Sequence, residues 1–331
     1  MSYSESQYPV VSVLIPVYNA ETYIGRCLDS ILSQDYPALE IVAIDDGSSD
    51  SSFAILEGYE RRHPSVVRAY HQQNQGVAVT RNKAISLASG VYLMFADNDD
   101  YLEPDSIKLL VNKALEANAD IVCAGFQRPD THGTIVSRVI PSPETQWAPY
   151  KVSAAWAKLY RTDFIRENNL SFLSTNIGED IYFTLPAQLL SNKTIIVPQV
   201  VYNWFYNTES VSNTLHKNSS NLEFTRTLTE LHSFLQVRGL PIEGLAIHYI
   251  VRLIVWFLFY TRKGDGPSQS MKSLDSCIHW LDETIPGWRN DAFATPRKPT
   301  GDAISNRIAT WLFVHHAMLF RVALRSIGCL L

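Results

Sequence analysis

Cysteine is scarce in this 331-residue chain, and its four copies form no pair or cluster. They are Cys27, Cys123, Cys277 and Cys329. A structural zinc site needs closely spaced thiolates, and a disulfide framework is typical of short secreted chains that are dense in cysteine. We therefore expect neither, and the composition favours a reducing cytoplasm.

The sequence also shows neither the pattern of a signal peptide nor that of a membrane-spanning segment. The N-terminal stretch "MSYSESQYPV" lacks the basic and then apolar order of a signal peptide. No uninterrupted apolar run approaches the ~18–20 residues that cross a bilayer. We therefore expect a cytoplasmic protein.

An excess of positive charge is absent too, because the formal net charge is −5. Nucleic-acid binding depends on clustered Lys and Arg that neutralise phosphates, so no nucleic-acid partner is expected. With 46% hydrophobic residues, the chain can bury a full-sized core in one large domain or two smaller ones.

The first 125 residues alternate between strand and helix patterns. Short apolar runs are followed by segments whose apolar residues recur at helical spacing. The runs lie at 10–17, 39–44, 66–70, 91–96 and 120–126. Strands separated by single helices pair in parallel, and continuously apolar strands are covered on both faces. We expect an α/β fold with a mostly parallel, doubly wound sheet and helices on both faces.

The regular alternation ends after residue 125. Residues 128–149 are rich in Pro, Ser and Thr and are predicted to form a loop or a short hairpin over the site. Residues 153–168 have a helical pattern, and residues 193–206 have a strand pattern. Beyond Leu222 the chain is predicted to be largely helical, with a polar break at 261–270.

No glycine-rich phosphate loop follows the first strand. The stretch "PVYNAE" contains neither G-x-G-x-x-G nor a Walker A pattern, so phosphate is not expected to bind on glycine-exposed N–H groups. Asn19 in this turn is either the N-cap of the next helix or a ligand contact, and the sequence leaves both open.

Adjacent acids follow the second strand. Asp45 and Asp46 precede a glycine turn in "IDDGSSD", where Ser48, Ser49 or Asp50 can cap the next helix. Ligands bind beyond the carboxyl ends of strands in such sheets, and a carboxylate placed there needs donors or matching charge. The imide N–H and ribose hydroxyls of a nucleoside are suitable donors.

The fourth apolar run breaks into acids in "VYLMFADNDDYLEPD". Asp97 and Asp99 are two residues apart, so in extended structure both carboxylates point the same way. Such oxygen ligands suit Mg²⁺ or Mn²⁺, and Mg²⁺ usually takes one or two carboxylates plus substrate phosphates. The alternative is a solvated acidic turn. Together the strand ends predict a nucleoside diphosphate ligand whose phosphates are held by a metal ion.

Four blocks in order resemble family 2 glycosyltransferases with the GT-A fold: "VSVLIPVYNAETYIGRCLDSIL", "EIVAIDDGSSDSS", "NQGVAVTRNKAI" and "GVYLMFADNDDYLEPD". "WAKLYR" and "GEDIYFTLPAQLL" extend the resemblance from about residues 9–125 to about residue 215. It implies a nucleotide-sugar-binding half at 1–125, an acceptor-binding and catalytic half at 126–215, and a helical C-terminal extension at 216–331.

The resemblance also implies roles for particular residues. The nucleotide pocket would be lined by Pro16, Tyr18, Asn19 and Glu21, with Asp45 and Asp46 at the base and ribose. The donor site would further include Arg81, Asn82, Asp97 and Asn98. Asp97 and Asp99 occupy the positions of the D-x-D motif that binds Mn²⁺ or Mg²⁺, with Asp99 favoured as the direct ligand.

Inversion in a single displacement needs a base on the acceptor side of the sugar. Glu179 and Asp180 in "NIGEDIYF" match the acid pair that carries this role in the family, and we favour Asp180. The alternative is that both are acids at a helix N-terminus, where the dipole stabilises negative charge.

Two positions depart from the family pattern. Ala157 in "WAKLY" replaces an asparagine, and Asn207 stands where relatives often have arginine. Charge balance on the leaving diphosphate is then expected from one of four residues, Lys158, Arg161, His216 or Lys217.

The C-terminal third raises the question of membrane contact. The apolar stretch at 245–263 is expected to be a packed helix, with a membrane-dipping helix as the alternative. On a single helix over the final segment, Arg307, Arg321 and Arg325 fall within ~40° of one another. The apolar residues fall on the other side and include Leu312, Phe313, Leu319, Phe320 and Ile327. This predicts a helix that rests on an anionic membrane surface or docks on protein.

We therefore expect an inverting, metal-assisted glycosyltransferase, peripheral at the inner face of the cell membrane. Its donor would be a nucleoside diphosphate-sugar, expected to be a UDP-sugar, and its acceptor a hydroxyl of a growing polysaccharide or glycolipid of the cell envelope. The alternatives are a sugar-phosphate nucleotidyltransferase and a non-catalytic nucleotide-sugar-binding scaffold.

Overall fold

The computed structural model describes residues 8–206, 218–297 and 301–326. The chain forms two compact units. The first comprises Met1–Glu144, Lys151–Ser174 and Glu179–Thr208, and the second Thr145–Tyr150, Thr175–Gly178 and Glu209–Leu331.

The first unit is built on one sheet, to which nine strands of the described ranges contribute. They are β1 (Val11–Val17), β2 (Leu39–Asp46), β3 (Val67–Gln72), β4 (Tyr92–Phe95), β5 (Tyr101–Leu102), β6 (Ile121–Pro129), β7 (Ile135–Val139), β8 (Lys158–Arg161) and β9 (Thr194–Asn203). The spatial order is β3-β2-β1-β4-β8-β6-β9-β5, with β7 paired to β6. The parallel pairs are β1 with β2 and β4, β2 with β3, and β6 with β9. The predicted α/β fold is confirmed.

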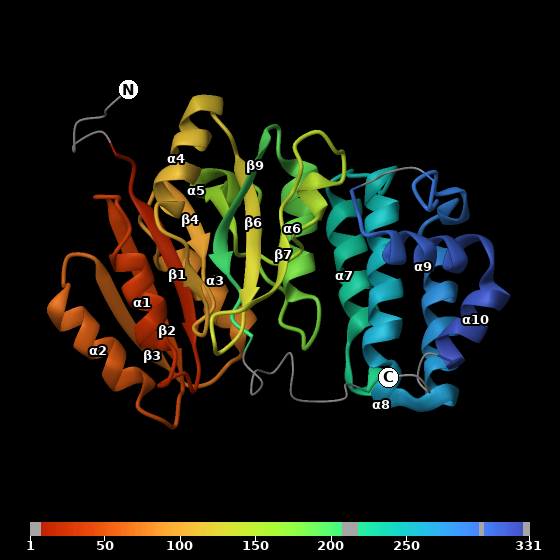
Figure 1. Ribbon diagram of the computed structural model, residues 1–331, viewed down its shortest axis with the longest axis horizontal. Coiled ribbons are helices and arrows are strands. Elements are labelled where there is room, and N and C mark those ends of the chain that lie inside the picture. The colour runs from red at the N-terminus through yellow and green to blue at the C-terminus, as the bar shows by residue number, and fades with distance from the viewer. Residues whose placement is uncertain (1–7, 207–217, 298–300, 327–331) are drawn as a thin grey trace. The chain divides into compact units, whose positions relative to one another are not determined.

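Helices pack along the sheet in this unit, as Figure 1 shows. They are α1 (Ile24–Leu32), α2 (Ser52–Arg62), α3 (Val77–Leu87), α4 (Ser106–Ala117), α5 (Thr162–Glu167) and α6 (Glu179–Leu190). Val13 and Ile15 of β1 share an apolar cluster with Ile24 and Leu28 of α1. Leu14 is equally buried although alternate side chains of a strand face opposite sides, so both faces of the sheet are covered.

The helix expected at 153–168 is largely wrong. Only α5 is helical, and Lys158–Arg161 forms β8, which pairs antiparallel with β4 and β6. Tyr160 is fully buried and pairs with Leu93, so tertiary pairing outweighs the local helical pattern. Ala157 has φ +56°, a left-handed conformation that asparagine tolerates better than alanine. The backbone of the "WAKLY" block therefore adopts a geometry suited to asparagine although the amide is missing.

Of the loop and the short hairpin predicted for residues 128–149, the structure contains the hairpin. β7 pairs antiparallel with β6, which makes a hairpin, and Gly133 in its turn has φ +79°. At Gly125 of β6 the neighbouring backbone lies so close that only glycine fits. A Cβ added there would lie 2.6 Å from the Val139 carbonyl oxygen.

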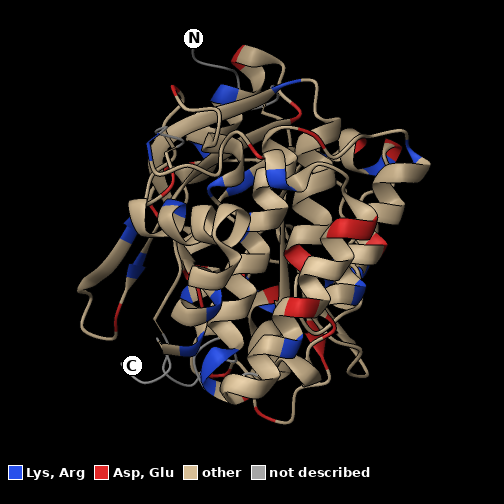
Figure 2. Cartoon of the chain, turned by 90° about the vertical axis from the view of Figure 1, so that its right-hand side faces the viewer, with Lys and Arg blue, Asp and Glu red and all other residues tan. Residues whose placement is uncertain are grey.

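The second unit is helical. Its elements are η2 (Ala148–Tyr150), η3 (Ser219–Asn221), α7 (Phe224–Val237), α8 (Leu245–Thr284), η4 (Trp288–Asn290), α9 (Ile304–His315) and α10 (Ala317–Ser326). Gly266 of α8 has non-helical angles and precedes Pro267, so the polar break falls where it was predicted. Figure 2 shows Lys and Arg scattered among Asp and Glu along the chain, in agreement with the small net charge.

By length and composition alone, α8 could cross a membrane, which the sequence argument did not expect. However, 67% of its apolar 18-residue window is buried inside the structure. Phe257, for example, stacks on Phe224 of α7 with ring centroids 4.2 Å apart. This burial favours a packed core helix.

The single helix expected over the final segment is wrong, because the chain breaks at His316 between α9 and α10. Arg321 pairs with Asp275, and Arg307 donates to the Pro296 carbonyl, so two arginines of the predicted stripe are engaged within this unit. Phe320 is buried, whereas Leu319 is 57% exposed. Ile327 lies outside the described residues.

Candidate active site

One buried arginine joins acids that are far apart in the sequence. Arg81 lies on α3 and is only 4% exposed. One terminal nitrogen, Nη2, lies 2.7 Å from Asp97 Oδ1, and the other, Nη1, lies 3.1 Å from Asp180 Oδ1 and 3.8 Å from Glu179 Oε1. The structure thus brings the predicted metal-binding acid together with both predicted base acids.

Three acids of this region, Glu179, Asp180 and Asp99, have raised pKa values and retain protons more readily than usual. Burial, followed by the neighbouring Asp180, raises the pKa of Glu179 to about 7. Burial also raises the pKa of Asp180, although Arg81 opposes the change. Burial and the charge of Asp97 raise the pKa of Asp99 to about 6. The carboxylates near Arg81 therefore carry more negative charge, when ionised, than its single positive charge can neutralise.

The turn after β4 is held from several sides. Arg26 donates to the Asp99 carbonyl at 2.7 Å. Asp100 is fully buried, and its carboxylate accepts from the Tyr202 hydroxyl at 2.7 Å and from the Phe205 N–H at 2.8 Å. The Tyr202 oxygen in turn accepts from the Asp97 N–H at 3.0 Å. Asp100 therefore supports the turn through both of its carboxylate oxygens, whereas Asp97 Oδ1 is engaged by Arg81.

The turn fits a divalent cation that also binds phosphate. Among the described residues, no group of three or more His, Cys, Asp or Glu side chains could hold a metal ion. Mg²⁺ needs only one or two protein carboxylates when phosphates and water supply the rest. The raised pKa of Asp99 indicates negative charge that a cation would stabilise.

Asp45 presents a polar atom that lacks a partner. Its side chain is fully buried at the end of β2, where Oδ2 accepts from the Ser48 N–H and lies 2.7 Å from His71 Nδ1. Its Oδ1 atom is buried and has no hydrogen-bond partner among the described residues. A buried acceptor of this kind needs a donor, which a nucleobase N–H can supply.

His71 was not predicted from the sequence. It ends up beside Asp45 because β3 runs parallel to β2, and its ring lies 5.0 Å from that of Phe53. In the sequence, the one feature that points to His71 as a site residue is its position near the carboxyl end of a predicted strand.

Asp46 is used by the protein itself. Its carboxylate accepts from Gln72 Nε2 at 2.7 Å, from the Gln75 N–H at 2.9 Å and from the Gly76 N–H at 2.8 Å. These bonds hold the loop that leads into α3.

The helix-cap interpretation of Asn19 is wrong, because α1 begins at Ile24 with Tyr23 as its N-cap. Asn19 has φ +45°, and its Oδ1 accepts from the Ser49 N–H at 2.8 Å. Glu21 similarly accepts from the Ser51 N–H at 2.9 Å. These bonds tie together the loops after β1 and β2.

Other predicted pocket residues lie around the same edge. Tyr18 is 50% exposed directly after β1, and the Pro16 carbonyl accepts from Asn98 Nδ2 at 3.1 Å. Asn82 makes two bonds to the backbone of Phe172, so both ends of its amide are engaged.

Two residues proposed for charge balance on the diphosphate have other roles. Lys158 is buried and donates to the carbonyls of Val152 and Ala154, and burial lowers its pKa to about 8. Arg161 pairs with Tyr92, the first residue of β4, whereas Asp97 follows the last residue of that strand. Arg161 and Asp97 therefore lie at opposite edges of the sheet. The remaining candidates, His216 and Lys217, lie outside the described residues, as does Asn207.

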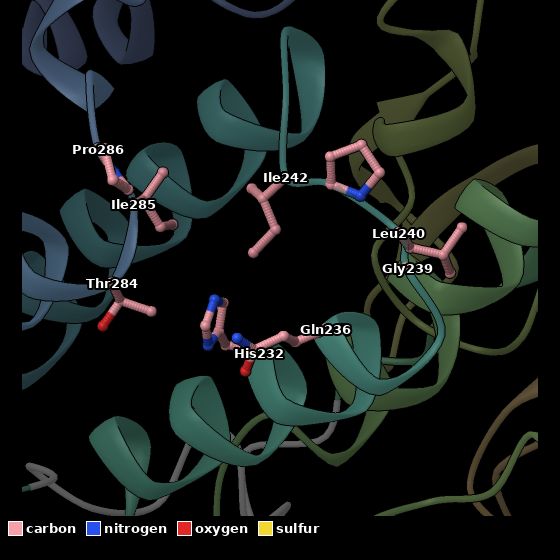
Figure 3. A pocket seen from close by; sticks show the side chains of 9 residues that line it. His232, Gln236, Gly239, Leu240, Ile242, Thr284, Ile285 and Pro286 are labelled. Atoms are coloured by element: carbon pink, nitrogen blue, oxygen red, sulfur yellow. The ribbon is translucent and has the colours of Figure 1, made fainter.

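The helical unit contains a cavity of about 320 Å³. Figure 3 shows His232 and Ile242 directed into it, between the end of α7 and the end of α8. None of the acids described above lines this cavity.

Comparisons with known sequences agree on one family. A model described as glycosyl transferase family 2 matches residues 12–176. The uncharacterized glycosyltransferase YibD of Escherichia coli (strain K12) is 30% identical over 243 residues, which cover 68% of this chain and 70% of the relative. The poly(ribitol-phosphate) beta-glucosyltransferase of Bacillus spizizenii (strain W23) is 32% identical over 204 residues, 59% of this chain and only 32% of the relative.

Comparisons with solved structures agree on the fold. S. aureus TarS 1-349 in complex with UDP-GlcNAc has a TM-score of 0.67 at 18% identity, covering 96% of this chain and 90% of that one. The mannosyltransferase PcManGT from Pyrobaculum calidifontis, in complex with GDP-Man and Mn²⁺, has a TM-score of 0.56 at 15% identity, with the same coverage. The GT-A fold is thereby confirmed.

The raised pKa of Glu179 predicts a pH-dependent effect of Glu179→Gln. A folded-state pKa of about 7, above the ordinary 4.5, means that the folded protein binds this proton more tightly, so wild-type stability falls as pH rises between these values. Glutamine does not titrate, so the variant does not lose this stability. Its free energy of unfolding should be higher than that of wild type by on the order of 1 kcal/mol at pH 8, and by less at pH 4.5. Urea unfolding across this range measures it. The control Glu116→Gln, on the surface of α4, should follow the wild-type profile, and a Glu179→Gln profile parallel to wild type would contradict the prediction.

Proposed function

The chain belongs to glycosyltransferase family 2, and we propose that it transfers a sugar from a nucleoside diphosphate-sugar to an acceptor hydroxyl with inversion at the anomeric carbon. The observation that carries this proposal is the convergence of Asp97, Glu179 and Asp180 on Arg81. One end of this cluster suits the leaving diphosphate and the other suits the attacking hydroxyl. Neither the nucleotidyltransferase nor the scaffold alternative agrees with membership of this family.

We propose that the donor is a UDP-sugar. The unpartnered Asp45 Oδ1 suits the imide N–H of uracil. Pro16, Tyr18, Asn19 and Glu21 would line the same pocket, and Asp46 would approach the ribose while holding its loop. The TarS structures with UDP-GlcNAc and with UDP support this choice of nucleotide.

We propose that Asp99, with Asp97, holds Mn²⁺ or Mg²⁺ beside the diphosphate. The bound ion would supply positive charge to the leaving group. The Mn²⁺ in the PcManGT complex supports a divalent ion in this fold. Arg81 keeps Asp97 in place, since its guanidinium fixes one carboxylate oxygen.

We propose that Asp180 accepts the proton of the attacking hydroxyl, with Glu179 beside it. The two acids interact with each other and with Arg81, so they titrate as a group and not as separate sites. A pKa near the working pH is favourable for a general base. Arg81 keeps one carboxylate ionised, because a buried guanidinium requires a negative partner.

The acceptor is proposed to be a growing polysaccharide or glycolipid of the cell envelope, met in the cytoplasm at the inner membrane face. The polymer named in the Bacillus spizizenii relative supports an envelope acceptor. Residues 1–125 would bind the nucleotide-sugar and 126–215 the acceptor, with 216–331 as the helical extension. In that extension, residues 303–331 contain three arginines and no acid. Met318, Leu319 and Val322 of α10 are exposed, which suits an anionic bilayer.

The metal assignment predicts that Asp99→Ala weakens binding of UDP in Mn²⁺ by roughly tenfold or more, to the level of wild type in EDTA. Isothermal titration with UDP measures this. Glu116→Ala removes an exposed acid from α4 and should bind as wild type does. Unchanged Mn²⁺-dependent binding by Asp99→Ala would remove the assignment.

The base assignment predicts that Asp180→Asn lowers kcat by about 10²–10⁴-fold while UDP binding stays near normal, because a base acts only in the transition state. Glu179→Gln, measured in parallel, shows which acid carries the larger share. Steady-state transfer from a radiolabelled UDP-sugar at saturating substrate measures kcat. If both variants transfer at the wild-type rate, the base lies elsewhere.

The membrane proposal predicts that the full-length protein sediments with phosphatidylglycerol vesicles at low salt but not with phosphatidylcholine vesicles. The double variant Met318→Ser, Leu319→Ser should lose most of this binding, because it removes exposed apolar area from α10. Val237→Ser, which alters an 84% exposed residue of α7, is the matched control. Wild-type protein that stays in the supernatant with anionic vesicles would refute the proposal.

A further inference from the structure

We propose that the acceptor saccharide binds on a row of stacked side chains that begins at the D-x-D turn and ends at the surface. The row, called here the acceptor row, consists of Tyr202, Trp156, Trp204, Arg128 and Tyr206. This inference rests on the proposed function, since it names the place where the accepting sugar is held.

The inner end of the acceptor row is anchored at the proposed metal-binding turn. The Tyr202 hydroxyl accepts from the Asp97 N–H and donates to Asp100. The Trp156 ring stacks on the Tyr202 ring with centroids 4.7 Å apart and planes 4° apart. Trp204 follows at 6.0 Å from Trp156. The row therefore starts at the Asp97 backbone.

The outer end alternates rings with a guanidinium. The Arg128 guanidinium carbon lies 4.0 Å from the Trp204 ring centre and 4.4 Å from that of Tyr206. The Trp204 N–H donates to the Gln127 carbonyl at 2.9 Å, and the Tyr206 N–H donates to the Pro129 carbonyl at 2.8 Å. These backbone bonds extend the pairing of β6 and β9, so the outer residues are fixed before a ligand arrives.

Exposure increases along the acceptor row. Tyr202 is fully buried and Trp156 is 6% exposed, whereas Trp204, Arg128 and Tyr206 are half-buried. The inner pair therefore serves as a support, and Trp204, Arg128 and Tyr206 each keep part of their surface exposed to solvent. A pyranose ring has an apolar C–H face and a rim of hydroxyls, and it is suited to aromatic surface beside N–H and O–H donors.

The strand order places the acceptor row on the side opposite the nucleotide pocket. Asp97 follows β4, and the nucleotide acids Asp45 and Asp46 end β2. The row lies at the ends of β6 and β9, with Trp156 just before the start of β8. β1 separates β4 from β2, and β8 separates β4 from β6. An inverting displacement needs the acceptor opposite the leaving diphosphate, and a row on the β6 and β9 side of the Asp97 turn, away from Asp45, is compatible with that need. A nucleobase, which could also stack on aromatic rings, is better served by the pocket at Asp45.

Saturation-transfer NMR on the full-length protein tests this site with methyl pyranosides of glucose, galactose, mannose, N-acetylglucosamine, N-acetylgalactosamine and glucuronic acid. Each is titrated with and without UDP and Mn²⁺. We expect at least one pyranoside to bind, and Trp204→Ala and Tyr206→Ala each to weaken it by about fivefold or more through loss of stacking. Trp204→Phe should retain most of the binding.

The matched control is Trp256→Ala, which removes a half-exposed tryptophan stacked on Tyr260 of α8, and it should bind pyranosides as wild type does. The UDP dissociation constant should be unchanged in every variant, and each variant is assayed well below its own unfolding temperature, because Trp204→Ala also removes packing against Phe126 and Trp156. The inference is overturned if no pyranoside binds the wild type, or if binding survives in both Trp204→Ala and Tyr206→Ala. A protein that binds pyranosides through Trp204 but does not bind UDP would instead overturn the proposed function.

Discussion

The site depends on the burial of one guanidinium among three carboxylates. A buried charge is costly unless it is paired, so Arg81 and its acids hold each other in place. The acids outnumber the arginine, and the remaining negative charge has two consequences. It favours protonation of Glu179 and Asp180, and it makes the nearby turn attractive to a cation.

Arg81 reaches this position through a chain of backbone contacts. Asp46 accepts from the N–H groups of Gln75 and Gly76, and Gly76, with φ +86°, is the N-cap of α3. A carboxylate that the sequence assigned to the ribose thus also sets where α3 begins, and with it where Arg81 lies. The proposed nucleotide pocket and the proposed catalytic acids are therefore connected through α3.

The sequence predicts local features well and distant contacts poorly. Apolar runs and the acids that end them are adjacent along the chain, so the strands and the residues at their carboxyl ends could be placed in advance. β8 could not, because its extended form depends on pairing Tyr160 with Leu93 and Ile121. The link from Arg81 to Asp180 spans 99 residues and leaves no local pattern. Asn19 was misjudged in part because its bonds go to the next loop and not to the next helix.

The proposed donor and acceptor surfaces both adjoin the Asp97–Asp100 turn, which three other elements hold in place. Arg81 and Arg26 hold it from α3 and α1, and Tyr202 holds it from β9. Because these three elements hold the turn, residues farther out along the acceptor row or the proposed nucleotide pocket can change without moving Asp97 and Asp99, the proposed metal ligands. On the proposed function, specificity for either sugar can therefore vary at the ends of β2, β6 and β9 while the proposed metal-binding turn after β4 stays in place.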